Sequence, residues 1–177
     1  IFGPESKLLV RENATEKNLR RELLDRYQVI SFATHGIIRP EVTDINDSAL
    51  ILTNVDESNP FDNGLLTATE IANLNLTADM IMLSACNSAN YDIDLFGSEV
   101  QGISTAFAYA GTPNTVATLW SVDSESTEYL SVKLMQNYAD SGNRAIAESL
   151  RLAISDYLSE IESIAYAHPR FWSSYVI

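Results

Sequence analysis

The sequence has one cysteine, few basic residues and no long apolar run, and each shortage excludes a class of protein. Because Cys86 is the single cysteine, an internal disulfide and a zinc site built on cysteine pairs are both excluded. No apolar run reaches the about 20 residues that span a bilayer, and the N-terminus lacks the cationic and then apolar layout of a signal peptide. We therefore expect a cytoplasmic chain without a membrane partner.

Positive charge is scarce throughout the chain. There are 11 Lys and Arg residues against 24 Asp and Glu residues, which gives a formal net charge of -13. A surface this negative repels phosphate backbones, so nucleic acid and anionic membranes are excluded as partners. A basic peptide or a basic protein segment would instead be attracted.

The residues that are present are those of one globular domain. The chain has 177 residues, 46% hydrophobic and 20% charged, and the usual domain size is about 150 residues. Because the chain starts at Ile1 and stops at an apolar, strand-like end, we expect a piece of a longer polypeptide. Residues 1–13 show no periodicity and are expected to be an irregular remnant of an upstream segment, followed by one domain over residues 14–177.

Short apolar segments alternate with helical patterns along this domain. The predicted buried strands cover residues 27–34, 49–52, 80–85, 115–120 and 171–177. Helices are predicted from Ala14, from the capping box Thr67–Glu70, and over residues 100–110, 124–137 and 143–158. Polar loops are expected over residues 37–48, 54–64 and 87–98. The alternation predicts an α/β fold, a three-layer α/β/α sandwich with a mainly parallel sheet.

Two details of these helices can be tested. Thr15 is placed to cap the first helix, whose apolar residues Leu19, Leu23 and Leu24 are predicted to share one face. Gly111 and Gly142 follow helical patterns at positions where a positive φ is favoured or the helix breaks.

His35 and Cys86 each follow a predicted buried strand, 27–34 in one case and 80–85 in the other. The carboxyl ends of parallel strands meet at one edge of a sheet, where such folds bind their ligands. If the two strands are neighbours, the imidazole and the thiol face each other. Each residue alone is more commonly structural, since free cysteine is often buried and a lone histidine is often a core or surface residue. Their joint placement favours chemistry.

The chemistry that this pair favours is nucleophilic catalysis. A thiol with a pKa of about 8.5 is mostly protonated at neutral pH, so it gains from an imidazole that takes its proton. The backbone N–H groups of Gly36 and Cys86 are candidate donors to an oxyanion. The scattered loop acids lack the spacing of a calcium loop, so no metal is expected.

Several segments in order carry a family resemblance: Thr34–Gly36, Asp62–Ile71, Leu83–Ser88, Leu119–Asp123, and His168-Pro169 with Phe171-Trp172. Together they resemble the CHAT domain, a caspase-like peptidase domain often found behind tetratricopeptide repeats in bacteria and similar to the protease domain of separase. His35 also lies 51 residues before Cys86, close to the interval of about 50 residues in caspases.

The resemblance, which starts at about Ala14, implies a caspase–haemoglobinase fold, a His/Cys dyad and no cofactor. It implies that His35 is the general base or acid, Cys86 the nucleophile and Gly36 an oxyanion donor. The implied function is a cysteine endopeptidase that cleaves a protein or peptide through an acyl-enzyme, regulated by a partner or an attached repeat domain. The alternative is an inactive caspase-like interaction or regulatory module.

Trp120, Ser121 and Asp123 are the candidate substrate-binding residues. In separase an acid directly follows the tryptophan and receives a basic side chain, whereas this chain has Ser121 there and its acid two positions later, at Asp123. Asp123 is therefore either a substrate contact or, with Ser124 as the other candidate, the cap of the next helix, and capping is the favoured interpretation. Trp120 is either a pocket wall or part of the core.

Overall fold

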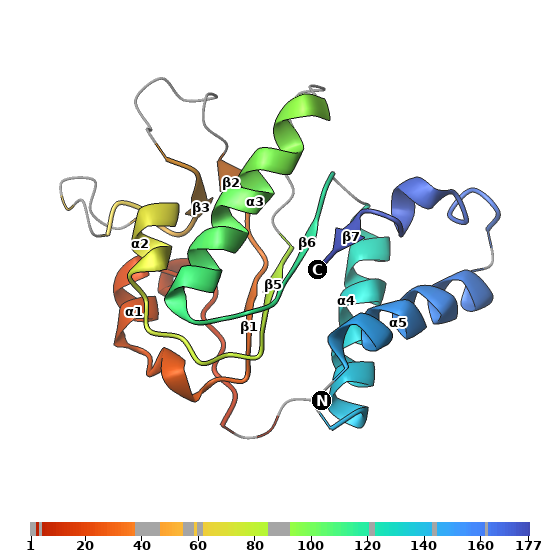
Figure 1. The fold of residues 1–177 in the computed structure, drawn as a ribbon, viewed down its shortest axis with the longest axis horizontal. Helices are drawn as coiled ribbons and strands as arrows, with labels where there is room; N and C mark the ends of the chain where they lie inside the picture. The colour runs from red at the N-terminus through yellow and green to blue at the C-terminus, as the bar shows by residue number, and fades with distance from the viewer. Residues whose placement is uncertain are drawn as a thin grey trace.

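A mainly parallel, four-stranded sheet in the order β1-β5-β6-β7 forms the centre of the molecule (Figure 1). The computed structural model describes residues 3, 5–37, 47–54, 59, 62–84, 93–120, 123–142, 145–161 and 163–177. Strands β1 (Val29–Phe32), β5 (Met80–Leu83) and β6 (Thr115–Thr118) run parallel, and β7 (Tyr175–Val176) pairs antiparallel with β6. The predicted α/β class with a mainly parallel sheet is confirmed.

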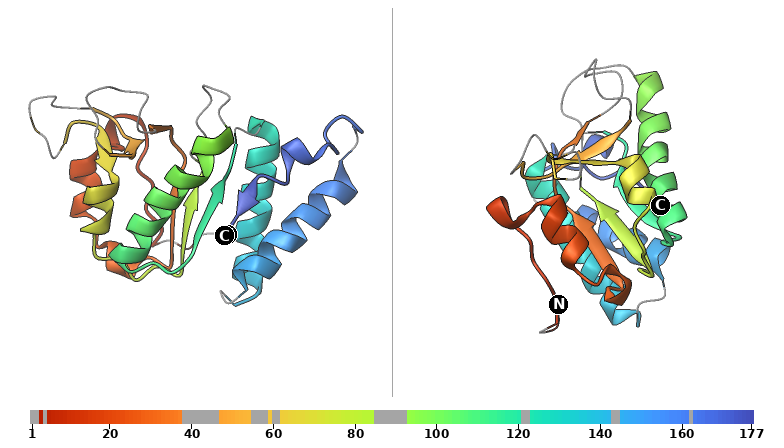
Figure 2. Two further views of the ribbon diagram at one scale, coloured as in Figure 1. Left: turned by 45° about the horizontal axis from the view of Figure 1, so that its top comes forward. Right: turned by 90° about the vertical axis from the view of Figure 1, so that its left-hand side faces the viewer.

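Helices pack against both faces of this sheet (Figure 2), and its strand β5 is apolar throughout. Ile81 and Leu83 pack in one core cluster, and their neighbours Met80 and Met82 pack in another. All four side chains are buried. A strand buried on both faces is expected to be a continuous apolar run, and for this reason the sequence predicted β5 so well.

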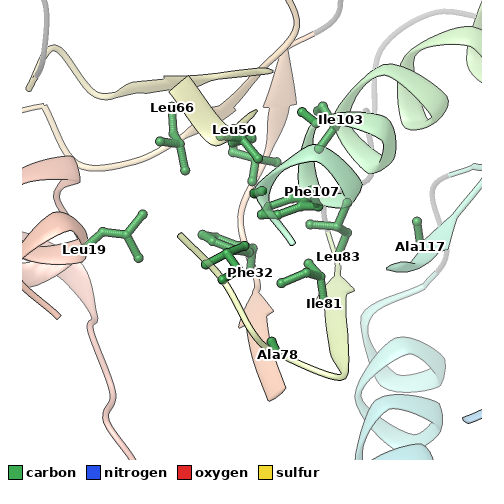
Figure 3. Close-up of a cluster of buried hydrophobic side chains, with 14 residues drawn as sticks. Leu19, Phe32, Leu50, Leu66, Ala78, Ile81, Leu83, Ile103, Phe107 and Ala117 are labelled. Carbon is green, nitrogen blue, oxygen red and sulfur yellow. The ribbon is translucent and has the colours of Figure 1, made fainter. Parts of the chain in front are cut away.

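Three helices contribute to the first cluster: α1 (Glu16–Arg21), α2 (Ala68–Ala72) and α3 (Ile93–Ala110). Figure 3 shows Phe107 of α3 beside Phe32, Ile81 and Leu83 of the sheet. The rings of Phe32 and Phe107 lie 5.5 Å apart between centroids. The second cluster is formed with α4 (Ser124–Asp140) and α5 (Ile146–Glu160). None of the helices in the described ranges is long and apolar enough to cross a bilayer.

A second sheet of three short antiparallel strands lies beside the first, in the order β2-β3-β4. Its strands are β2 (Gly36–Ile37), β3 (Ala49–Ile51) and β4 (Leu65–Thr67). The predicted strand 49–52 therefore exists but does not belong to the parallel sheet. The sequence did not predict β2 and β4, because two or three residues are too few to establish an alternating pattern.

The start of the domain differs from the prediction in the length of its first helix. Glu22 has extended backbone angles, so α1 ends at Arg21. Leu19 is buried, but Leu23 is 55% exposed, and Leu24 belongs to a separate 3-10 turn, η2 (Leu24–Arg26). The prediction that these leucines share one helix face is wrong, because α1 ends before Leu23 and Leu24 are reached.

Other boundaries shift without changing the order of elements. Helix α3 starts at Ile93, seven residues earlier than predicted, and the predicted strand 171–177 shortens to β7 behind a 3-10 turn, η3 (Pro169–Phe171). Within residues 1–13, predicted to be irregular, the structure places a 3-10 turn, η1 (Arg11–Asn13).

The predicted caps and breaks are confirmed. Thr15 accepts a hydrogen bond from the Asn18 N–H, and Thr67 and Glu70 form a complete capping box. Gly111 ends α3 with a φ of +114°, and a Cβ there would lie 2.3 Å from the Leu76 carbonyl oxygen. Only glycine fits such an approach. Gly142 follows α4 with a φ of +71°.

A buried carboxylate ties α1 to the second sheet. Glu16 is fully buried, and its Oε2 accepts a hydrogen bond of 2.8 Å from the backbone N–H of Gly64, just before β4. The Nη2 atom of Arg20 lies 3.7 Å from the other carboxylate oxygen of Glu16, Oε1. Burial raises the pKa of Glu16 above its ordinary value, against the opposing effect of the Gly64 hydrogen bond.

We expect Glu16→Ala to destabilise the fold by about 1–3 kcal/mol, because the buried Gly64 N–H loses its acceptor. Glu16→Gln keeps an acceptor and should lose much less stability.

The stability should also depend on pH through Glu16, because folding raises the pKa of this residue. Its contribution to the free energy of unfolding is fully present below the unfolded-state pKa and is lost as pH rises through the folded-state pKa. The Gln variant should lack this dependence. Urea unfolding from pH 4 to pH 8 measures both effects, and equal losses for Ala and Gln at pH 7 would contradict the assigned role.

Candidate active site

The candidate site lies where β1 and β5 end. The two strands are paired in parallel, with Phe32 opposite Leu83, and the N–H of Ser84 donates to the Phe32 carbonyl at 2.9 Å. The chain therefore leaves both strands at the same edge of the sheet. The sequence predicted that His35 and Cys86 face each other if their strands are neighbours. The strands β1 and β5 are neighbours. Cys86 itself lies outside the described residues.

His35 is exposed and is anchored to the second sheet by its backbone. Its carbonyl oxygen accepts a hydrogen bond of 2.8 Å from the N–H of Ile51 in β3. The hydroxyl of the preceding residue, Thr34, donates to the carbonyl oxygen of the same Ile51. The link from β1 to His35 is thus attached to β3 by two hydrogen bonds.

The backbone N–H of Gly36 faces away from β3. In an antiparallel ladder, hydrogen-bonded pairs alternate with pairs that exchange no hydrogen bond. Because the Ile51 N–H bonds the His35 carbonyl, the next pair, Gly36 with Leu50, is of the second kind. The ladder therefore does not use the Gly36 N–H, and β2 is one of the two edge strands of its sheet among the described residues. An N–H in this position can donate to a ligand.

Trp120 lies two residues beyond the end of β6, at the same edge of the central sheet. Its side chain is half-buried, and its indole Nε1–H donates to the carbonyl oxygen of Arg170 at 2.9 Å. This bond joins the end of β6 to η3 in the C-terminal part of the chain. Ser121 lies outside the described residues.

Asp123 is the N-cap of α4. Its Oδ2 accepts from the backbone N–H groups of Glu125 at 3.1 Å and Ser126 at 3.3 Å. The favoured interpretation, that this acid caps the helix, is confirmed. The carboxylate is exposed and is held at the start of α4, three residues after Trp120.

Two contributors to this site could not be found by sequence reasoning. The Thr34 hydroxyl donates to the carbonyl of Ile51, and the Arg170 carbonyl accepts from the indole of Trp120. In both bonds the partner is distant in sequence. The sequence signal was present for Thr34, since it directly precedes His35, but nothing in the sequence names its partner. Within the described part of the chain, no group of three or more His, Cys, Asp or Glu residues is placed to hold a metal ion.

Comparison with known proteins identifies one family. The family model of the CHAT domain, a family of caspase-like peptidases, matches residues 1–177. The match includes residues 1–13, upstream of the point at which the sequence resemblance was placed. No curated protein matches the chain.

We expect Asp123→Ala to destabilise the protein by about 1 kcal/mol, because α4 loses its cap, whereas Asp123→Ser keeps a capping oxygen and should lose less. Thermal unfolding of the two variants and the wild type measures the difference. Equal stability of all three proteins would show that the cap contributes nothing. The Ser variant also removes the charge while keeping the helix start, so it separates capping from a contact with a basic substrate.

Proposed function

The chain belongs to the CHAT domain family, and from this premise we propose that it is a cysteine endopeptidase with His35 and Cys86 as its catalytic dyad. The observation that carries the proposal is the parallel pairing of β1 with β5, because it makes the segments that bear these two residues leave the sheet at one edge. The exposed position of His35 supports the proposal, since a general base must be accessible to substrate.

In the proposed first half-reaction, His35 takes the proton of the Cys86 thiol. The thiolate sulfur then bonds to the carbonyl carbon of the scissile peptide, and the carbonyl π electrons move to its oxygen. When the tetrahedral intermediate collapses, the carbon–nitrogen bond breaks and the imidazolium gives its proton to the leaving amine. The product of this stage is a thioester between the substrate acyl group and Cys86.

In the second half-reaction, His35 takes a proton from water as the water oxygen bonds to the thioester carbon. The carbon–sulfur bond breaks, the thiolate recovers a proton from His35, and the acid product leaves. These steps need no cofactor, because every proton passes between the imidazole, the thiol, the amine and water.

Gly36 is the proposed oxyanion donor, together with the N–H of Cys86. The support for Gly36 is the direction of its N–H, which the β2–β3 ladder leaves unused, and the absence of a side chain beside it. A donor of this kind contributes about 100- to 1,000-fold to kcat in other hydrolases.

We also propose a fold type, a substrate class and a cellular setting for this domain. The helices on both faces of the sheet support a three-layer α/β/α arrangement of the caspase–haemoglobinase type. We assign the substrate pocket to Trp120, Ser121 and Asp123. The net charge of -13 supports a basic protein or peptide as substrate. The domain would belong to a longer chain, in which an attached or partner domain regulates it, in the cytoplasm, where a reactive cysteine stays reduced.

We expect Cys86→Ala to lower cleavage of a peptide library by about 1,000-fold or more, since no other group in the proposed reaction replaces the nucleophile. His35→Ala should also be strongly impaired. The matched control is His168→Asn: His168 caps η3 through Nδ1, so Asn keeps the cap, and full activity is expected. Mass spectrometry of the cleaved library gives both rate and preference. Unchanged cleavage by Cys86→Ala would refute the proposal.

We also expect Cys86 to react with iodoacetamide with an apparent pKa below the value of about 8.5 for a free thiol. His35→Ala should return the profile to that of the urea-unfolded protein. The measurement is the alkylation rate between pH 5 and pH 10. If the folded, unfolded and His35→Ala proteins share one profile, the inactive interaction module becomes the better description.

A further inference from the structure

We infer that residues 5–14, here called the N-terminal segment, hold His35 in position through β3 and so act as a regulatory device for the site. The inference that the segment regulates catalysis rests on the proposed peptidase function. The mechanical connection does not, because it rests on backbone contacts alone.

The first part of the connection joins the N-terminal segment to the end of β3. The N–H of Thr53 donates to the Ala14 carbonyl at 2.8 Å, and the Thr53 hydroxyl donates to the Arg11 carbonyl at 2.6 Å. Two hydrogen bonds from one residue therefore fix the chain just beyond β3 to the last residues of the segment.

The second part of the connection joins β3 to His35. Ile51 bonds the His35 carbonyl through its N–H and accepts from the Thr34 hydroxyl through its own carbonyl. Leu52 alone separates Ile51 from Thr53, and its N–H donates to the Gly64 carbonyl at 2.8 Å. A three-residue stretch of chain thus bonds His35 at one end and the N-terminal segment at the other. Movement at Thr53 is expected to reach His35.

The N-terminal segment is strained and lightly held. Arg11 has a φ of +50°, which L residues other than glycine rarely adopt, and such strain persists only where surrounding contacts impose it. Lys7 pairs with Glu22 at 3.2 Å, but its side chain is 52% exposed, and exposed pairs of this kind are weak. Leu8 is 78% exposed, so it adds little apolar burial. The Asn18 side chain also donates to the Asn13 carbonyl at 3.0 Å. Together with this bond, the contacts at Thr53 are the main attachments among those described for the segment.

There is also space for the segment to move. A cavity of about 400 Å³ is lined by Lys7, Leu8 and Leu9 of the segment and by the residues of β1, an edge strand of the central sheet among the described strands. The same cavity reaches Thr34, Ile51 and Thr53. Displacement of the segment into or out of this cavity would therefore alter the supports of His35.

The test uses the imidazole signals of His35 in the NMR spectrum. The chain has two histidines, so His168→Asn leaves His35 as the single source of imidazole signals. In this background, Thr53→Val removes the bond to Arg11, and Thr77→Val is the matched control. The Thr77 hydroxyl donates to the Asp25 carbonyl at 2.6 Å, the same distance, but Thr77 precedes β5 at the opposite edge of the sheet from His35.

We expect Thr53→Val to shift the His35 Cε1–H signal toward that of Thr34→Val, which breaks the direct anchor, and Thr77→Val to leave it unchanged. Lys7→Glu, which turns the weak attraction to Glu22 into repulsion and so loosens the segment without touching β3, should give a smaller shift in the same direction. This variant keeps the test possible if Thr53→Val does not fold. Equal His35 signals in the Thr53, Lys7 and Thr77 variants would overturn the inference.

Activity measurements separate this inference from the proposed function. With a peptide that the wild type cleaves, Thr53→Val should lower kcat about 10-fold or more with little change in KM, and Thr77→Val should not. If the wild type cleaves and the Thr53 and Thr77 variants match it in rate and in His35 signal, the connection is refuted and the peptidase stands. If Cys86→Ala equals the wild type while Thr53→Val still moves the His35 signal, the peptidase is refuted and the connection stands.

Discussion

The parallel pairing of β1 with β5 is the constraint on which the candidate site depends. Its register is fixed because β5 is buried on both faces. A slip of one residue would exchange the side chains of Ile81 and Leu83 with those of Met80 and Met82 between the two core clusters. With the register fixed, Phe32 and Leu83 end their strands together. The chemistry proposed at this edge thus depends on packing several residues away.

The site draws on both sheets, and each contributes something the other lacks. The central sheet sets where the chain leaves β1, β5 and β6, whereas the antiparallel sheet sets the position of His35 and the direction of the Gly36 N–H. The buried carboxylate of Glu16 fixes Gly64, whose carbonyl in turn holds Leu52 beside β3. The buried hydrogen bond of Glu16 is therefore connected to His35, the proposed base, through Gly64 and the chain at Leu52 and Ile51.

The sequence predicted those features that depend on neighbouring residues. The apolar run of β5, the capping box at Thr67 and the cap at Asp123 each express a local rule, and each is present. The features it missed depend on distant partners: β2 and β4 are strands because β3 lies between them, and Leu23 is exposed because Glu22 leaves the helix. In the site, the sequence placed His35 at the correct edge but could not show that Ile51 anchors it.

The long connection between β1 and β5 also bears on how the chain acquires its structure. Helices α4 and α5 follow each other and pack together, so their contacts close a short loop, whereas Val29 meets Met80 only after the whole antiparallel sheet and α2 have been accommodated between them. Closing a longer loop costs more entropy, and non-local strand pairs form slowly. The helical hairpin should therefore collapse first. The edge that carries His35 would be completed late, so the activity proposed for it would appear only once most of the fold has formed.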